Sequence, residues 1–208
     1  MAPDEAAKEF AEAIRLNPGS AKAHVNLGSL LTAKGEFDKA QNHFERALQI
    51  EPKNAEYHSG YAYLLDQLGR KEQAASECET AIRLAPKSAQ AHYGYGAFLE
   101  KHGQPEEAIA KYRQALQYDP NHVDAHIDLG NLLFETGETA EAREHFQKAS
   151  TLNPKLAQPH NYLGKVLMRE GNVSQAIAQF EEALRLHPDF PEAEQNLRIA
   201  KGTSAQSP

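Results

Sequence analysis

Apolar and small side chains recur along this chain in two alternating helical stripes. In residues 21–54 the first stripe takes positions i, i+3, i+4 and i+7, at His24, Leu27, Gly28 and Leu31. The second stripe follows at Ala40, Phe44, Ala47 and Leu48. Because this spacing places side chains on one face of a helix, the segment predicts two amphipathic helices, called A and B below.

The whole pattern repeats every 34 residues. The repeat is marked by Pro18, Pro52, Pro86, Pro120, Pro154 and Pro188, and by Gly35, Gly69, Gly103, Gly137 and Gly171. Five complete units follow one another at 21–54, 55–88, 89–122, 123–156 and 157–190. A period of this length with a helix pair in each unit predicts an all-α solenoid of stacked antiparallel helix pairs.

The residues between the stripes predict where each helix begins and ends. Each glycine of the series comes just after helix A, where a left-handed residue commonly closes a helix. Each proline lacks an amide hydrogen and therefore ends helix B. Helix A is preceded by the good N-cap residues Ser20, Asn54 and Ser88. The residues at the equivalent positions of the later units, His122, Leu156 and Phe190, are expected to cap poorly.

The ends of the chain predict an incomplete repeat and a cap around a single array over residues 1–201. The half repeat 1–20 contains only a helix B, with Ala6, Phe10 and Ala13 in its stripe. Its missing helix A predicts a longer array, or self-association through this unpaired N-terminal helix. At the other end, 191–201 is predicted as a capping helix and 202–208 as a disordered tail.

Composition narrows the class of protein. The 208 residues carry a formal net charge of −7, with 40% hydrophobic and 25% charged residues, and no apolar run approaches the ~20 residues that span a membrane. No Lys/Arg cluster suits nucleic acid, so neither nucleic-acid binding nor membrane insertion is expected. Cys78, the single cysteine, stands where other units have Phe or Tyr, and is expected to be a buried apolar filler in a cytoplasmic protein.

The glycine and proline series, together with Leu-Gly in helix A and an aromatic residue in helix B, resemble the pattern of the tetratricopeptide repeat (TPR) family over about residues 4–201. The resemblance implies a right-handed superhelix whose A helices line a concave face. It also implies a scaffold or adaptor that binds a protein or peptide ligand on that face.

The resemblance places on the concave face the residues one and five positions after a recurring histidine, and others further along helix A. Exposed hydrophobic contacts to a peptide are expected from Tyr63, Tyr93, Ile127 and Phe134. Polar contacts are expected from Asn131, Asn161, Lys165 and Arg169.

The recurring histidines are His24, His58, His92, His126 and His160, where the family usually has a bulky aromatic residue. Equivalent positions of stacked repeats lie on the order of 10 Å apart, whereas ligands lie about 2 Å from a shared zinc ion. The series is therefore expected to pack between helices and to hold no metal. A second hypothesis is that protonation of these imidazoles loosens the stack in mild acid.

Two other functions stay open. Stretches such as AHVNLG, AHIDLG and PHNYLG resemble repeats that precede the catalytic part of O-linked sugar transferases. If this resemblance reflects function, the chain is the non-catalytic arm of a larger enzyme, or of a secretion or assembly complex. The other alternative is that the chain is an architectural spacer that binds no ligand in its groove. A phosphate loop, a nucleophile elbow, H-E-x-x-H and C-x-x-C are absent, so we expect no enzyme, no catalytic residue and no cofactor.

The small-residue series provides the first prediction. Ala108 belongs to a series of alanines that let the helices approach closely, so Ala108→Leu is expected to overpack the interface and lower the free energy of unfolding by about 1–3 kcal/mol. Chemical denaturation measures this change. An unaltered unfolding midpoint would show that the helical register is wrong.

Overall fold

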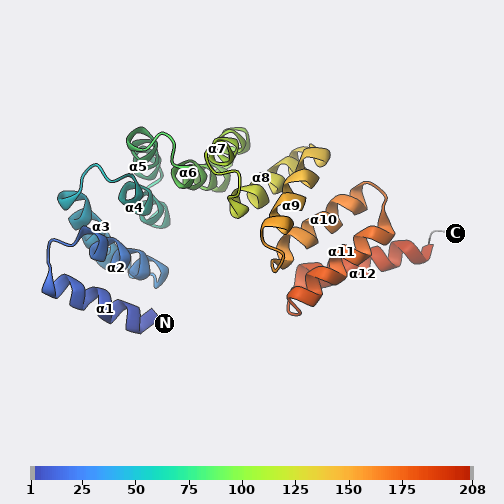
Figure 1. Cartoon of the computed structure of the whole chain (residues 1–208), viewed down its shortest axis with the longest axis horizontal. Coiled ribbons are helices and arrows are strands. Elements are labelled where there is room, and N and C mark those ends of the chain that lie inside the picture. Colours follow the sequence, from blue (N-terminus) through green and yellow to red (C-terminus); the bar gives the residue numbers. More distant parts are fainter. Residues whose placement is uncertain (1–2, 207–208) are drawn as a thin grey trace. The chain divides into compact units, whose positions relative to one another are not determined.

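The computed structural model describes residues 3–206, which form helices joined by short turns, with no strand among them (Figure 1). Within these residues the helices are α1 Pro3–Leu16, α2 Ala21–Ala33, α3 Phe37–Ile50, α4 Ala55–Gln67, α5 Lys71–Leu84, α6 Ala89–Lys101, α7 Pro105–Tyr118, α8 Val123–Thr136, α9 Thr139–Leu152, α10 Ala157–Arg169, α11 Val173–Leu186 and α12 Pro191–Gln206. None of these helices combines the length and the apolar character that a membrane crossing requires.

The helices form two compact units, Met1–Lys111 and Tyr112–Pro208, and the boundary falls within α7. In the first unit α2 packs on α3 and α4 packs on α5, and in the second α8 packs on α9 and α10 on α11. Successive A helices also touch: α2 contacts α4, α4 contacts α6, α8 contacts α10, and α10 contacts α12. The predicted all-α fold of consecutive helix pairs is confirmed.

The helix ends follow the glycine and proline series. Every glycine of the series has a positive φ, between 72° and 96°, so each takes up the left-handed conformation that a side chain would strain. Each helix B ends two residues before its proline, as α3 does at Ile50. The predicted N-caps form, since Ser20, Asn54 and Ser88 accept hydrogen bonds from the first turns of α2, α4 and α6.

One capping prediction was wrong. His122 caps α8, because its Nδ1 atom accepts a hydrogen bond from the amide of Ala125 at 3.2 Å. An imidazole nitrogen with a lone pair serves here as the side-chain oxygens of Ser and Asn do elsewhere. Leu156, as expected, makes no side-chain cap.

In the pairs α2–α3, α8–α9 and α10–α11, an aromatic ring of helix B lies against a glycine of helix A. A Cβ atom added to Gly28 would lie 3.0 Å from the ring of Phe44, and one added to Gly130 would lie 2.8 Å from the ring of Phe146. Around these rings the alanine series at 40, 74, 108, 142 and 176 is fully buried. Only small residues allow helices to approach this closely.

The C-terminal helix is longer than predicted. α12 extends to Gln206, so residues 202–206, which we expected to be disordered, are helical, while 207–208 lie outside the described residues. Two contacts support the extension: Nζ of Lys201 lies 2.8 Å from the Glu181 carboxylate, and the Thr203 hydroxyl donates to the carbonyl of Ile199.

The recurring histidines pack between the helices of their own repeat, and His24, His58 and His126 are held at both ring nitrogens. In four of them, His24, His58, His92 and His126, Nε2 lies 2.9–3.3 Å from the carbonyl of the proline six residues earlier. In two repeats Nδ1 faces a second imidazole on helix B, His24 with His43 at 3.0 Å and His126 with His145 at 2.8 Å.

These imidazole pairs predict a loss of stability in mild acid. Burial, and then the neighbouring imidazole, lower the pKa of His43 and of His145, and burial lowers the pKa of His126. The folded chain therefore binds fewer protons than the unfolded chain, in which these groups titrate near 6.5. Stability is fully present above that value and falls as the pH drops through it.

We expect the melting temperature to fall between pH 7.5 and pH 5, and to fall less in the double variant His43→Gln, His145→Gln. Circular dichroism melts at closely spaced pH values measure this dependence. A profile that is flat over this interval in the natural chain would contradict the prediction.

Candidate groove and pocket on the A helices

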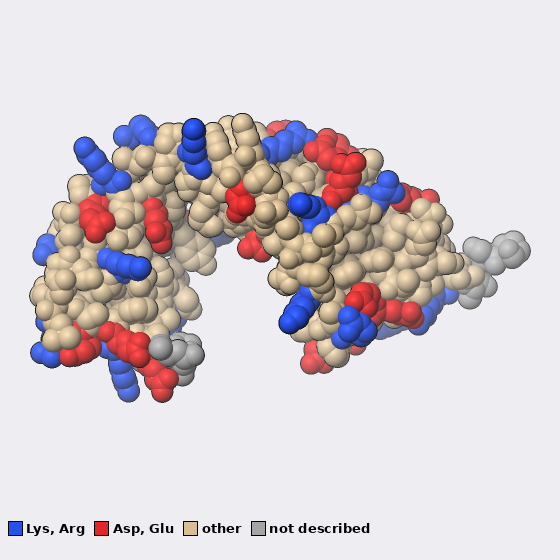
Figure 2. Space-filling view, viewed as in Figure 1, with Lys and Arg blue, Asp and Glu red and all other residues tan. Residues whose placement is uncertain are grey.

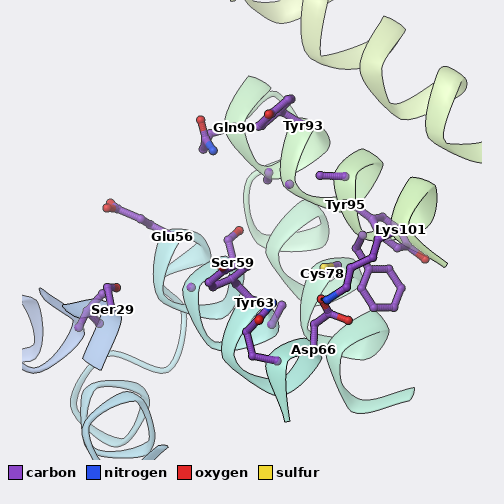
Figure 3. Close-up of a pocket in the computed structure, with 18 residues that line it drawn as sticks. Ser29, Glu56, Ser59, Tyr63, Asp66, Cys78, Gln90, Tyr93, Tyr95 and Lys101 are labelled. Carbon is purple, nitrogen blue, oxygen red and sulfur yellow. The ribbon is translucent and has the colours of Figure 1, made fainter. Parts of the chain in front are cut away.

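A pocket of about 680 Å³ opens in the first unit on the side of the A helices (Figure 3). Its walls come from α2, α4 and α6, and Cys78 of α5 contributes to its floor. The residues that the sequence placed one and five positions after the histidines line it on all three helices: Val25 and Ser29, Ser59 and Tyr63, Tyr93 and Ala97. Tyr63 is 60% exposed and is the most exposed aromatic side chain of the pocket wall.

The charges at the two ends of the pocket differ. At one end, where α4 and α6 terminate, the Asp66 carboxylate lies 2.6 Å from Nζ of Lys101 and 2.6 Å from Nε2 of His102. Burial would raise the pKa of Asp66, but the hydrogen bonds from Lys101 and His102 outweigh it and lower that pKa. At the other end, where the helices begin, Glu56 is exposed and forms no ion pair with any described residue.

The pocket lies where an aromatic ring is missing from the core. In the preceding repeat the ring of Phe44 lies between Gly28 of α2 and Gly60 of α4, where an added Cβ atom would meet it at 3.0 and 2.8 Å. The equivalent residues around Cys78 are Ala62 and Gly94, and both line the pocket. A Cβ atom added to Gly94 would meet nothing within 4 Å.

Cys78 itself is a small buried side chain, as the sequence predicted. It is 6% exposed, and burial, helped by the nearby carboxylate of Asp66, raises the pKa of its thiol to about 12. A thiol with this pKa stays protonated near neutral pH and is a poor nucleophile.

The predicted hydrophobic contacts of the second unit are not exposed, which corrects the sequence interpretation. Ile127 is 4% exposed and therefore belongs to the buried part of α8. Phe134 is 8% exposed, because the guanidinium carbon of Arg169 lies 3.5 Å from the centre of its ring. Of the four aromatic and aliphatic residues named from the sequence, Tyr63 and Tyr93 alone line the described pocket.

The predicted polar contacts of the second unit are engaged within the chain. Asn131 donates to Glu135, and Lys165 lies 3.1 Å from the carboxylate of Glu192. Arg169 donates to the carbonyl of Phe134 at 2.6 Å. Asn161 is fully buried and accepts a hydrogen bond from Asn196 of α12. A ligand in this unit would have to displace these contacts, so their role in binding stays a prediction.

The surface carries both signs of charge. On the face shown in Figure 2, Lys and Arg side chains are interspersed with Asp and Glu side chains. Among residues 3–206 no group of three or more His, Cys, Asp and Glu side chains is arranged to hold a metal ion.

Comparison with known families agrees with the geometry of the repeats. Models of the tetratricopeptide repeat match residues 3–54, 31–98, 99–165 and 157–190. The chain belongs to the tetratricopeptide repeat family. A search of curated proteins found no match to this TPR chain.

Several solved structures share the TPR fold. YrrB, described as "a TPR protein with an unusual peptide-binding site", is 23% identical with a TM-score of 0.65, over 91% of this chain and 97% of that one. Pseudomonas aeruginosa pilF is 18% identical with a TM-score of 0.75, over 94% and 98% of the two chains. Yeast Tom70 is 19% identical with a TM-score of 0.83, and the match covers 96% of this chain but 43% of Tom70. At these identities the likeness shows the fold.

The missing ring predicts opposite effects for two matched glycine substitutions. Gly60→Ala is expected to destabilise the chain by about 1–3 kcal/mol, because the new methyl group would press on the ring of Phe44. Gly94→Ala is expected to stabilise it by about 0.5–1 kcal/mol, because the methyl group enters open space and alanine favours the helix. Urea unfolding measures both changes, and a destabilising effect at both positions would show that the pocket is closed.

Proposed function

We propose that this chain is a protein-interaction scaffold or adaptor without catalytic activity of its own. It binds a peptide segment of a partner protein in the pocket of its first unit. The observation that carries the proposal is the pocket of about 680 Å³ on three successive A helices, whose lining includes the residues that the repeat pattern directs away from the core. The volume falls in the range of ligand pockets in proteins, about 300–1,000 Å³.

The composition of the pocket wall supports recognition of a protein segment. Tyr63 and Tyr93 offer large amphipathic surfaces, and aromatic residues of this kind dominate the energy of many interfaces. Ser29, Ser59 and Gln90 add hydroxyl and amide groups that suit the polar backbone of a peptide. The walls are packed helices, so little ordering entropy is lost when a ligand binds.

The neighbours in structure support the same class of function. YrrB is described as having a peptide-binding site, and another match, Cut9, is described in a hetero-tetramer with Hcn1. The chain spans 39% of the Cut9 chain, so a place within a larger protein, as the arm of an enzyme or of a secretion or assembly complex, is the alternative. In either setting the pocket is proposed to hold the partner, and a cytoplasmic location remains our expectation.

The proposal predicts that Tyr63 and Tyr93 are needed to capture the partner. In the double variant Tyr63→Ala, Tyr93→Ala, we expect partner binding about thirtyfold weaker, the equivalent of about 2 kcal/mol. The matched control is Tyr118→Ala, which removes a tyrosine that is 39% exposed on α7 and does not line the pocket.

Crosslinking of the tagged chain in cell extract, followed by quantitative mass spectrometry, measures the capture of each partner. Circular dichroism shows whether helicity is retained. Equal capture by the natural chain and the double variant, with the same helicity, would refute this assignment of the binding face.

A further inference from the structure

Part of the pocket, beside Cys78, corresponds to a position that other repeats fill with an aromatic side chain. Helix B carries a ring at this position in the other complete repeats: Phe44, Tyr112, Phe146 and Phe180. Each of these side chains is at most 1% exposed. In α5 the position is held by Cys78, whose side chain is too short to reach Gly94. The repeat thus retains the glycine on α6 that would accommodate a ring, but lacks the ring.

Gly94 has no packing reason to be a glycine. Glycine within a helix costs roughly 0.5–1 kcal/mol relative to alanine. Gly60, at the equivalent position of α4, has such a reason, because the ring of Phe44 would lie 2.8 Å from its Cβ atom. Gly94 faces only the space of the pocket. The space it leaves open is therefore available to a group from outside the chain.

The walls of this space favour an aromatic group. Tyr95 and Phe98 line it from α6, with their ring centres 6.1 Å apart, and the sulfur of Cys78 forms part of its floor. Aromatic rings pack well against one another and against sulfur at such distances. In Figure 3 the Cys78 sulfur lies next to the Asp66 and Lys101 side chains in the view, at the end of the pocket where the negative charge is already neutralised.

The opposite end of the pocket carries an uncompensated negative charge. Glu56 lies on the same face of α4 as Ser59 and Tyr63, at i, i+3 and i+7, and no described cation pairs with it. The pocket lining contains Glu56, Asp66 and Lys101 as its charged residues, so its net charge is negative. A positively charged residue of a ligand is complementary to this end.

We propose that the gap beside Cys78 receives an aromatic side chain of the partner segment, and that a Lys or Arg of the same segment faces Glu56. The inference rests on the proposed function and names the chemistry of its ligand. The partner's ring lies against Gly94, as the ring of Phe44 lies against Gly60 in the preceding repeat. The ligand completes the core of a repeat that the chain leaves incomplete.

The test is selection of a displayed library of random 12-residue peptides on the full chain. We expect peptides with Phe, Tyr or Trp close to Lys or Arg to be enriched. Parallel selection on Glu56→Gln is expected to keep the aromatic residue and to lose the preference for Lys and Arg.

Two variants close the gap from opposite sides, and one leaves it open. Cys78→Phe supplies the ring from α5, and Gly94→Leu fills the space from α6, where an added Cβ atom meets no neighbour. Both are expected to weaken the selected peptides at least about tenfold in fluorescence anisotropy. Cys78→Ala removes the thiol but keeps the gap, so it is expected to bind these peptides within about twofold of the natural chain.

Melting curves identify any variant that fails to fold. If Cys78→Phe fails to fold, Gly94→Leu alone tests whether filling the gap weakens binding. Undiminished binding by the filled variants would overturn the inference. Selected peptides that lack aromatic residues would overturn it as well and leave the groove proposal standing. Peptides with aromatic residues and no basic preference would overturn the assignment of Glu56. The absence of any enriched peptide would overturn both proposals.

Discussion

The structure depends on close contact between an aromatic ring of helix B and a glycine of helix A. Gly28, Gly130 and Gly164 each have such a ring against them, from Phe44, Phe146 and Phe180. The absence of a side chain on one helix makes room for a large one on its neighbour, and this lets the two helices approach closely. The alanine series of helix B, at 40, 74, 108, 142 and 176, is fully buried in the same interfaces.

At the pocket this contact between a ring and a glycine is absent. Around Cys78 the glycine of α6, Gly94, remains, but the ring is absent and Ala62 replaces the glycine of α4; α4 still contacts both α5 and α6. Space that would be filled in a neighbouring repeat is thereby exposed to the groove. A repeat fold tolerates such a loss because each unit is stabilised mainly by its immediate neighbours. The proposed recognition of a partner's ring follows from the same packing geometry that builds the fold.

The fold was largely predictable from the sequence, because the helix ends depend on local chemistry. A glycine at positive φ and a proline without an amide hydrogen act within one turn, so their positions predicted where α2 and α3 end. His122 was misjudged because N-capping is usually assigned to oxygen atoms, although an imidazole nitrogen also accepts. In the longer α12, Lys201 pairs with Glu181, a residue distant in sequence that local patterns do not reveal.

The candidate site was less predictable, because exposure depends on residues of the next helix. Phe134 lies on the expected face of α8, but Arg169 of α10 covers its ring. The pocket was missed for a related reason. Taken alone, Cys78 is a small apolar residue in a buried position. The gap becomes evident only when Gly94, on the neighbouring helix, is compared with Gly60, which packs against the ring of Phe44 in the preceding repeat.

The crystal structure of the Cys78→Phe variant tests the central claim most directly. If the ring and glycine contact determines helix spacing, the new ring will lie beside Gly94 as the ring of Phe44 lies beside Gly60, and α4 and α6 will keep their separation. A ring that points away from Gly94, or helices pushed apart to admit it, would contradict the account.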